Sequence, residues 1–207
     1  MKNKSSNKLL KGILVLEFCQ YLSGPSGAST VQAGNDRRQL EELLDSKQLV
    51  PQLIAASWSL SGGQRTEAIK RLKALASDIN PEISALAEAQ LWKTRVKTTA
   101  EGLESWKNRI RAMPESVRAG PYFILAGGLA GNNQIDEAAL AYLRIPILHP
   151  EQHSLVAASL YQCGDLLQNK GRSVQARTLW RELIQKYPQS FWAQQAASKL
   201  SAAAPRK

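Results

Sequence analysis

Residues 156–188, VAASLYQCGDLLQNKGRSVQARTLWRELIQKYP, decide the fold. Apolar side chains recur in the second half at alternating spacings of three and one, which places them on one face of a helix: Ala176, Leu179, Trp180, Leu183, Ile184 and Tyr187. A similar stripe precedes it: Val156, Leu160, Cys163 and Leu167. Lys170-Gly171-Arg172 predicts a turn between the two helices. We therefore expect an antiparallel pair, in which the small residues Gly164 and Ala176 let the axes approach closely.

The pattern of paired amphipathic helices repeats toward the N-terminus, and a proline follows each repeat. Pro81, Pro114, Pro150 and Pro188 follow one another at nearly even intervals, and each comes after a segment typical of an amphipathic helix. A period of roughly 35 residues is typical of stacked helical pairs that bury one another's apolar faces. The preceding stripes are Ala68, Leu72, Leu75, Ala76 and Ile79, then Leu103, Trp106, Ile110 and Met113.

Each pair needs a first helix, and a proline suits the first turn because its missing N–H has no helical partner there. We place the first helices at residues 51–60, 81–97, 114–130 and 150–169. Pro146 lies inside a second helix, where it removes a hydrogen bond to Tyr142, so we expect that helix to bend or end early. No alternating strand pattern competes with this interpretation.

The predicted fold class is therefore all-α, an α-solenoid of about four antiparallel helix pairs with a C-terminal capping helix. The capping helix carries Phe191, Trp192, Ala196, Ala197 and Leu200. The predicted divisions are an N-terminal targeting segment (1–33), a lead-in helix (34–47, centred on 36–45), the repeat domain (48–203) and a disordered tail (204–207).

The N-terminal segment, 1–33, has the pattern of a secretory signal peptide. Four lysines precede a mainly apolar stretch, residues 9–22, and small residues follow it. Glu17 and Gln20 interrupt the stretch, which is too short to span a bilayer comfortably. The alternatives are an uncleaved membrane anchor, an interfacial helix and a buried helix. Because Leu16-Glu17-Phe18 precedes Cys19, we do not assign a lipoprotein signal.

The remaining composition indicates a soluble helical domain rather than an enzyme. The chain has 207 residues, 43% of them hydrophobic, and a net charge of +10 that is dispersed over several helices. Removal of the leader would leave Cys163 alone and exclude an intramolecular disulfide. Because Cys163 lies on the apolar stripe, we interpret it as a small buried hydrophobe. His149 and His153 lack a third metal ligand and are interpreted as surface histidines. No catalytic or phosphate-binding motif is present, and we predict no catalytic residues, cofactor or metal.

The repeat resembles the tetratricopeptide-repeat superfamily, whose pattern is W-x2-L-G-x2-Y, then A-x3-F, then P. The last unit matches at Gly164, Ala176, Trp180 and Pro188. The third unit matches at Tyr122, Leu125, Ala126, Leu129, Ala138, Tyr142 and Pro150. The units before Pro81 and Pro114 match less well, since the latter has Gly102 at its small position and no glycine in the turn.

This resemblance implies a binding groove along the first helices, which takes an extended peptide or a partner helix. The groove positions that it implies are Phe123, Ile124, Gly127, Tyr161, Gln162 and Asp165. The Lys, Asn and Arg that grip carboxylates in some members are absent there, so an apolar or aromatic groove is expected. Packing of Phe123 and Ile124 against the adjoining unit is the alternative. The predicted partner-binding set is Tyr122, Phe123, Tyr161, Gln162 and Asp165.

The chain is therefore predicted to be a non-enzymatic scaffold for another protein or an extended peptide, with no small-molecule substrate. The leader, together with a resemblance to short bacterial envelope repeat proteins, predicts the periplasm or cell envelope. One alternative is a cytoplasmic or membrane-surface module whose basic faces bind nucleic acid or anionic lipid, although no aromatic and basic interleaving supports nucleic-acid binding. The alternative location is the cytoplasm, or the membrane through an uncleaved N-terminal segment. Another is an accessory domain of cell-wall machinery.

Overall fold

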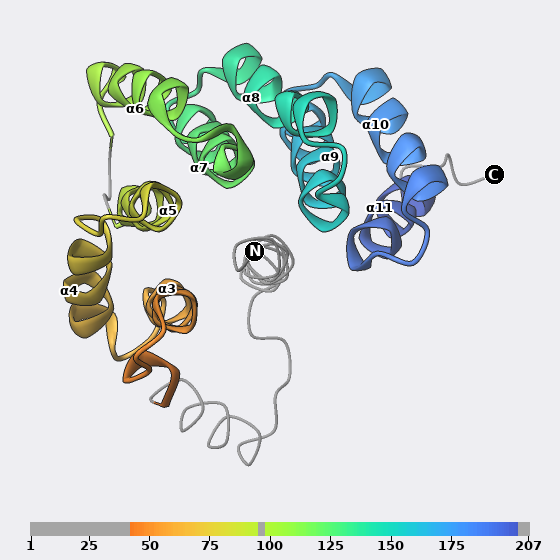
Figure 1. The fold of residues 1–207 in the computed structure, drawn as a ribbon. Helices are drawn as coiled ribbons and strands as arrows, with labels where there is room; N and C mark the ends of the chain where they lie inside the picture. Colours follow the sequence, from red (N-terminus) through yellow and green to blue (C-terminus); the bar gives the residue numbers. More distant parts are fainter. Residues whose placement is uncertain (1–41, 95–97, 203–207) are drawn as a thin grey trace. The chain divides into compact units, whose positions relative to one another are not determined.

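The computed structural model describes residues 42–94 and 98–202, which form helices and contain no strand (Figure 1). The helices are α3 (Leu49–Ser59), α4 (Arg65–Leu75), α5 (Pro81–Trp92), α6 (Ala100–Ala112), α7 (Ala119–Gly131), α8 (Ile135–Leu148), α9 (His153–Asn169), α10 (Ser173–Lys186) and α11 (Phe191–Ala202), with a 3-10 turn, η1 (Glu115–Val117). Helices adjacent in sequence pack in pairs. The predicted all-α solenoid class is confirmed.

The contacts divide the chain into two compact units. The first contains the described residues up to 94 together with 109–121, and the second contains 98–108 and 122–202. In the first unit, α3, α4 and α5 pack mutually, and α5 also contacts η1. In the second, α9 packs against α8, α10 and α11.

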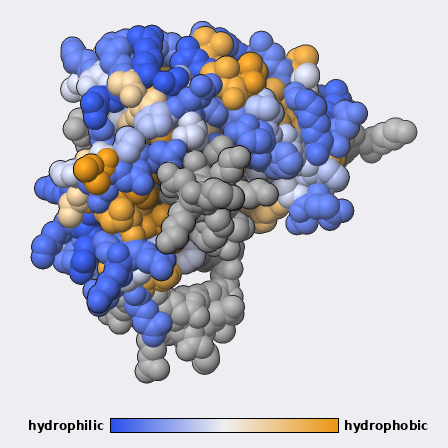
Figure 2. Space-filling model, in the orientation of Figure 1, coloured by the Kyte–Doolittle hydropathy of each residue, from blue (hydrophilic) through white to orange (hydrophobic). Residues whose placement is uncertain are grey.

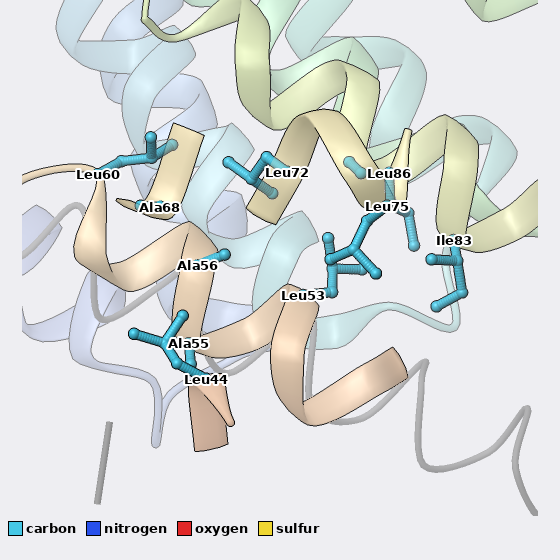
Figure 3. Close-up of a cluster of buried hydrophobic side chains, with 11 residues drawn as sticks. Leu44, Leu53, Ala55, Ala56, Leu60, Ala68, Leu72, Leu75, Ile83 and Leu86 are labelled. Carbon is cyan, nitrogen blue, oxygen red and sulfur yellow. The ribbon is translucent and has the colours of Figure 1, made fainter. Parts of the chain in front are cut away.

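The core of the first unit is formed by side chains from three helices that turn toward one another (Figure 3). Leu53 of α3, Leu72 of α4 and Ile83 of α5 are almost completely buried. They lie on the apolar faces of their helices, and each of these faces is buried against the other two helices. The full cluster is Leu44, Leu53, Ala55, Ala56, Leu60, Ala68, Leu72, Leu75, Ile83, Leu86 and Ala87.

The start of α5 agrees with the prediction from Pro81. Asn80 is the N-cap, and its side-chain oxygen accepts hydrogen bonds from the backbone N–H groups of Glu82 and Ile83 at 3.0 and 3.3 Å. Pro81 follows at the first helical position, where an N–H would be unsatisfied. Pro51 likewise lies in the first turn of α3.

The predictions from the next two prolines are wrong by several residues. After Pro114 the chain makes η1, and α7 begins only at Ala119. The Arg118 guanidinium stabilises this connection by donating to the backbone oxygen of Met113 at 2.9 Å. After Pro150 the chain makes a turn, and α9 begins at His153. In both places a short connection follows the proline before the helix starts.

Pro146 does not end α8 early, because the helix continues to Leu148. Proline removes only one intrahelical donor, and the last turn is closed by the bond from His149 N–H to the Ile145 oxygen at 2.9 Å. The expected early end is therefore wrong.

The last two helix pairs repeat one backbone geometry in their turns. Asn133 and Gly171, which occupy equivalent turn positions, have φ angles of 60° and 77°. The next N–H in each turn bonds back to a helix oxygen at 2.9 Å: Gln134 to Leu129, and Arg172 to Leu167. This is a C-terminal helix motif in which one left-handed residue reverses the chain. The two turns are therefore structurally equivalent although one uses asparagine and the other glycine.

We expect Gly171→Ala to lower the free energy of unfolding by about 1–2 kcal/mol, because alanine is disfavoured at positive φ. No neighbouring atom lies within 4 Å of an added Cβ at Gly171, so the cost is one of backbone conformation alone. Gly171→Asn is the matched control and should cost less, since Asn133 adopts this conformation in the preceding turn. Urea unfolding followed by circular dichroism measures both. Equal losses for the two variants would contradict this explanation.

The predictions for residues 1–33 and 204–207 lie outside the described residues, as does most of the lead-in helix. Its described helical part comprises residues 42–44, and Leu44 joins the core of the first unit. Within 42–94 and 98–202, no helix combines the length and apolarity that crossing a membrane requires.

Candidate partner-binding surface

The second unit positions the predicted groove residues through the close pairing of α9 and α10. Trp180 of α10 is 1% exposed, and its indole N–H donates to the backbone oxygen of Tyr161 at 3.4 Å. The ring lies against Gly164 of α9, where an added Cβ would be 2.8 Å from Trp180 Cδ1. The predicted role of Gly164 as the close-contact residue is confirmed. This contact fixes α9 on α10 and orients the remaining faces of α9.

Two members of the predicted partner-binding set, Tyr122 and Phe123 of α7, are buried. The Arg144 guanidinium lies over the Tyr122 ring, 5.4 Å from its centroid. Phe123 meets Tyr142 of α8 edge to face, with ring centroids 5.2 Å apart. Ile124 is also buried, so the packing alternative describes this helix better than a groove lining does. We therefore leave Tyr122 and Phe123 out of the candidate surface.

The other three members, Tyr161, Gln162 and Asp165 of α9, are half-buried beside α11. The Tyr161 ring packs on Trp192 of α11, with centroids 5.0 Å apart. Trp192 in turn meets Phe191 edge to face at 5.2 Å. We call Tyr161, Trp192 and Phe191 the aromatic row. It runs from half-buried Tyr161 through buried Trp192 to Phe191, which is 46% exposed.

An ion pair lies next to the aromatic row. Lys199 Nζ of α11 is 2.5 Å from Asp165 Oδ1, and the Asn169 amide donates to Asp165 Oδ2 at 3.3 Å. The bond to Asp165 raises the pKa of Lys199, so the ammonium stays charged at neutral pH. Burial raises the pKa of Tyr161, so its phenol stays protonated. Because the two charges compensate each other, the surface presents aromatic carbon and neutral polar groups.

Sequence reasoning missed the contribution of α11 to this surface. Phe191 and Trp192 were assigned to the capping stripe, and Lys199 was not singled out. These residues are distant in sequence from their partners on α9, and their approach depends on how α11 packs. The amphipathic pattern of residues 191–200 was the one feature of the sequence that indicated a helix packed at this place. Its helix is confirmed as α11, which buries Trp192, Ala193 and Ala196.

Cys163 lies completely buried on the apolar face of α9, which confirms its interpretation as a small hydrophobe. Its Sγ is 3.9 Å from the backbone oxygen of Ala139 on α8. Burial raises the pKa of Cys163 to about 12, because the thiolate would be poorly solvated. The neutral thiol is therefore the stable form throughout the physiological range.

We expect Cys163 in the folded protein to resist alkylation by iodoacetamide at pH 8, since the reactive species is the thiolate. Unfolding in urea should restore the normal pKa and make the thiol reactive. Mass spectrometry of tryptic peptides, with and without urea, measures the modification. Rapid alkylation of Cys163 in the folded chain would contradict the buried position.

The two histidines lie in different environments. His149 is 4% exposed, so its interpretation as a surface residue is wrong; His153 is exposed and its ring lies 5.9 Å from that of Tyr187. Among the described residues, no three His, Cys, Asp or Glu side chains gather as metal ligands would.

The comparison with protein families identifies one segment. Residues 158–190, which comprise most of α9, the turn at Gly171 and all of α10, match the family described as tetratricopeptide repeat. No curated protein and no solved structure matches the chain significantly. Repeats of this family are typically non-catalytic and bind other proteins or peptides. Residues 158–190 are therefore similar to a tetratricopeptide repeat, and a repeat of this kind suggests a protein–protein interaction module.

Proposed function

We propose that this chain is a non-enzymatic scaffold that binds another protein or an extended peptide along α9 and α11. The aromatic row carries the proposal, because it extends from the packed interior to the exposed ring of Phe191. Aromatic side chains supply large contact area at low entropic cost and are enriched at binding hot spots. Gln162 follows Tyr161 on α9, is half-buried, and carries an amide that can donate and accept hydrogen bonds.

The electrostatics of this surface favour an apolar or aromatic partner segment. The Asp165 carboxylate is held by Lys199, so neither charge is available without breaking the pair. A partner that places a leucine or an aromatic side chain on Phe191 would bury apolar surface without burying an unpaired charge. The expected ligand is thus an apolar peptide segment rather than a free C-terminal carboxylate.

The experiment compares surface variants that leave the α9–α11 packing intact. Tyr161→Ala would remove a ring that packs on Trp192, and it would mix loss of binding with loss of structure. Phe191→Ser with Gln162→Arg changes the accessible edge instead. Ile79→Ser is the matched control, because Ile79 is 99% exposed in the first unit. Its expected place on the apolar stripe before Pro81 is wrong, since α4 ends at Leu75.

Chemical crosslinking in the native host, followed by affinity capture and mass spectrometry, measures partner recovery. We expect the double variant to lose most of the partner while the Ile79→Ser variant retains it. Unchanged recovery with the double variant would exclude this surface as the binding site.

We further propose that the scaffold works in a bacterial cell envelope or periplasm, on the basis of the basic and apolar pattern of residues 1–33. Mass spectrometry of the N-terminus of protein from its host tests this directly. A mature start near Ser29 or Gly34 supports export. An intact Met1 contradicts cleavage and favours the cytoplasmic or anchored alternative.

The ion pairs on the helix surfaces favour a protein partner over nucleic acid. Arg71 pairs with Glu67 and Asp45, and Arg109 pairs with Glu88. Lys107 pairs with Glu104 and Glu137. Each of these three cations is already compensated by a carboxylate, which makes it less available to a phosphate group. A steep loss of nucleic-acid affinity with added salt would contradict this conclusion.

A further inference from the structure

A second surface of the second unit, distinct from the aromatic row, has an unfilled apolar groove. It lies between α8 and α10, encloses about 490 Å³, and is lined almost entirely by apolar atoms. We call it the α8–α10 groove; its lining includes Leu140, Leu143, Val174, Thr178 and Leu179. Leu140 is 62% exposed and Val174 is 82% exposed. Figure 2 shows hydrophobic residues gathered over α8 on this face.

The apolar lining continues along α8 beyond the groove. Ile147 is four residues after Leu143, hence one helical turn further on the same face, and it is 73% exposed. Leu140 to Ile147 therefore forms a stripe of about two turns, on the order of 10 Å long. An open apolar stripe of this length between two helices is the geometry that receives the apolar face of a third helix.

The chain itself shows that helix pairing does not require these apolar residues. Alignment of the two equivalent turns, Asn133 on Gly171, places Leu140, Leu143 and Ile147 of α8 opposite three residues of α10: Thr178, Arg181 and Gln185. The α10 positions are polar, and α10 nevertheless packs against α9. Helix packing at these positions therefore does not require apolar side chains, and the exposed Leu140 and Ile147 form the kind of apolar patch that marks interaction sites.

The charges around the groove determine which partner fits it. The acidic groups of α8 and α10 are all compensated: Asp136 by Arg172, Glu137 by Lys107, and Glu182 by Lys186. Arg181 lies one turn after Thr178 on α10 and is exposed, and its guanidinium makes no hydrogen bond or ion pair with any residue that the structure describes. An uncompensated positive charge therefore lies one helical turn beyond Thr178, which lines the groove.

We propose that the α8–α10 groove binds an amphipathic helix of a partner protein that carries acidic residues beside its apolar face. The apolar face covers Leu140, Leu143 and Val174, and a partner carboxylate pairs with Arg181. Burial of the exposed aliphatic carbon supplies most of the affinity, and the charge pair sets orientation and partner choice. This site is independent of the aromatic row, so the two surfaces can hold two different segments.

The test uses the full chain and two fluorescent peptides. The acidic peptide has leucine at helical spacings of three and four and glutamate at the remaining positions, and its basic twin has lysine in place of glutamate. Fluorescence anisotropy measures both dissociation constants. We expect the acidic peptide to bind about tenfold more tightly than the basic twin.

The variants locate the binding. Leu140→Gln with Val174→Gln should weaken the acidic peptide by about tenfold or more, whereas Ile79→Gln, at an exposed apolar residue outside the groove, should leave it unchanged. Arg181→Glu should reverse the order of the two dissociation constants, so that the basic peptide binds more tightly than the acidic one. This single variant tests the proposal even if the double variant folds poorly. Phe191→Ser should not alter peptide binding, which separates this site from the proposed function.

Two outcomes overturn the proposal. One is that the acidic peptide does not bind, or binds the double variant, Leu140→Gln with Val174→Gln, as tightly as it binds the unchanged chain. The other is a concentration-dependent dimer, seen by sedimentation velocity, that the same variant abolishes; the groove would then be covered by a second copy of this chain.

Discussion

Trp180→Ala is expected to lower the free energy of unfolding of the second unit by about 3–5 kcal/mol, the range for truncation of a buried large aromatic residue. Trp180 is 1% exposed and fills the space between α9 and α10. Its removal leaves a cavity in the helix pair and frees the Tyr161 carbonyl from its indole partner. Urea unfolding followed by far-ultraviolet circular dichroism measures the change.

Trp180→Tyr is the matched comparison, because Tyr142 occupies the equivalent position in the preceding helix pair. A tyrosine is accommodated by that helix pair, so the loss should be clearly smaller than with alanine. If Trp180→Ala cost less than about 1 kcal/mol, the indole would not be the central packing element of this pair.

Gly164→Ala is expected to be destabilising by up to about 2 kcal/mol. The added methyl group would lie 2.8 Å from Cδ1 and 3.0 Å from Cε2 of Trp180, so the helix axes or the indole must shift. Better helix propensity offsets about 1 kcal/mol of this cost. Gly127→Ala in α7 is the control with the opposite sign, since its methyl group would approach only the Tyr142 hydroxyl, at 3.9 Å. That variant should gain up to about 1 kcal/mol.

The effects of substitutions at Gly164 and Trp180 should be coupled, because the preceding unit has a different pair of residues at the same two packing positions. Ala126 and Tyr142 stand where the last unit has Gly164 and Trp180, so a larger first residue accompanies a smaller aromatic ring. In a Trp180→Tyr background, Gly164→Ala should therefore lose most of its cost. A double-mutant cycle measures the coupling, expected at about 0.5–3 kcal/mol. Strict additivity would show that the methyl group and the indole do not compete for one space.

These stability effects also bear on the proposed binding surfaces. Tyr161 and Asp165 are presented by α9, whose position on α10 is fixed at Gly164 and Trp180. A variant that loosens this contact should weaken partner recovery even though it touches no surface residue. Binding measurements therefore need the exposed variants, Phe191→Ser and Leu140→Gln, rather than core substitutions.

The periodic pattern of the sequence by itself determined the helices, their pairing and the close contact at Gly164. Apolar spacing indicates which face of a helix is buried, because it follows from helix geometry alone. The close contact was predictable because a short turn joins the two helices and the repeat pattern has a small residue at Gly164 and an aromatic one at Trp180. The starts of α7 and α9 were misplaced because the connections after Pro114 and Pro150 depend on short-range turn bonds that the pattern does not encode.

The accessibility of the candidate site was decided only by the tertiary structure. Tyr122 and Phe123 are buried in the core. The Tyr161 ring packs on Trp192, and the Asp165 carboxylate pairs with Lys199, in both cases through the neighbouring helix α11. The α8–α10 groove likewise exists because two outer helices leave space that their own side chains do not fill. A sequence specifies the face that a residue occupies on its own helix, but packing between helices determines whether that face is covered.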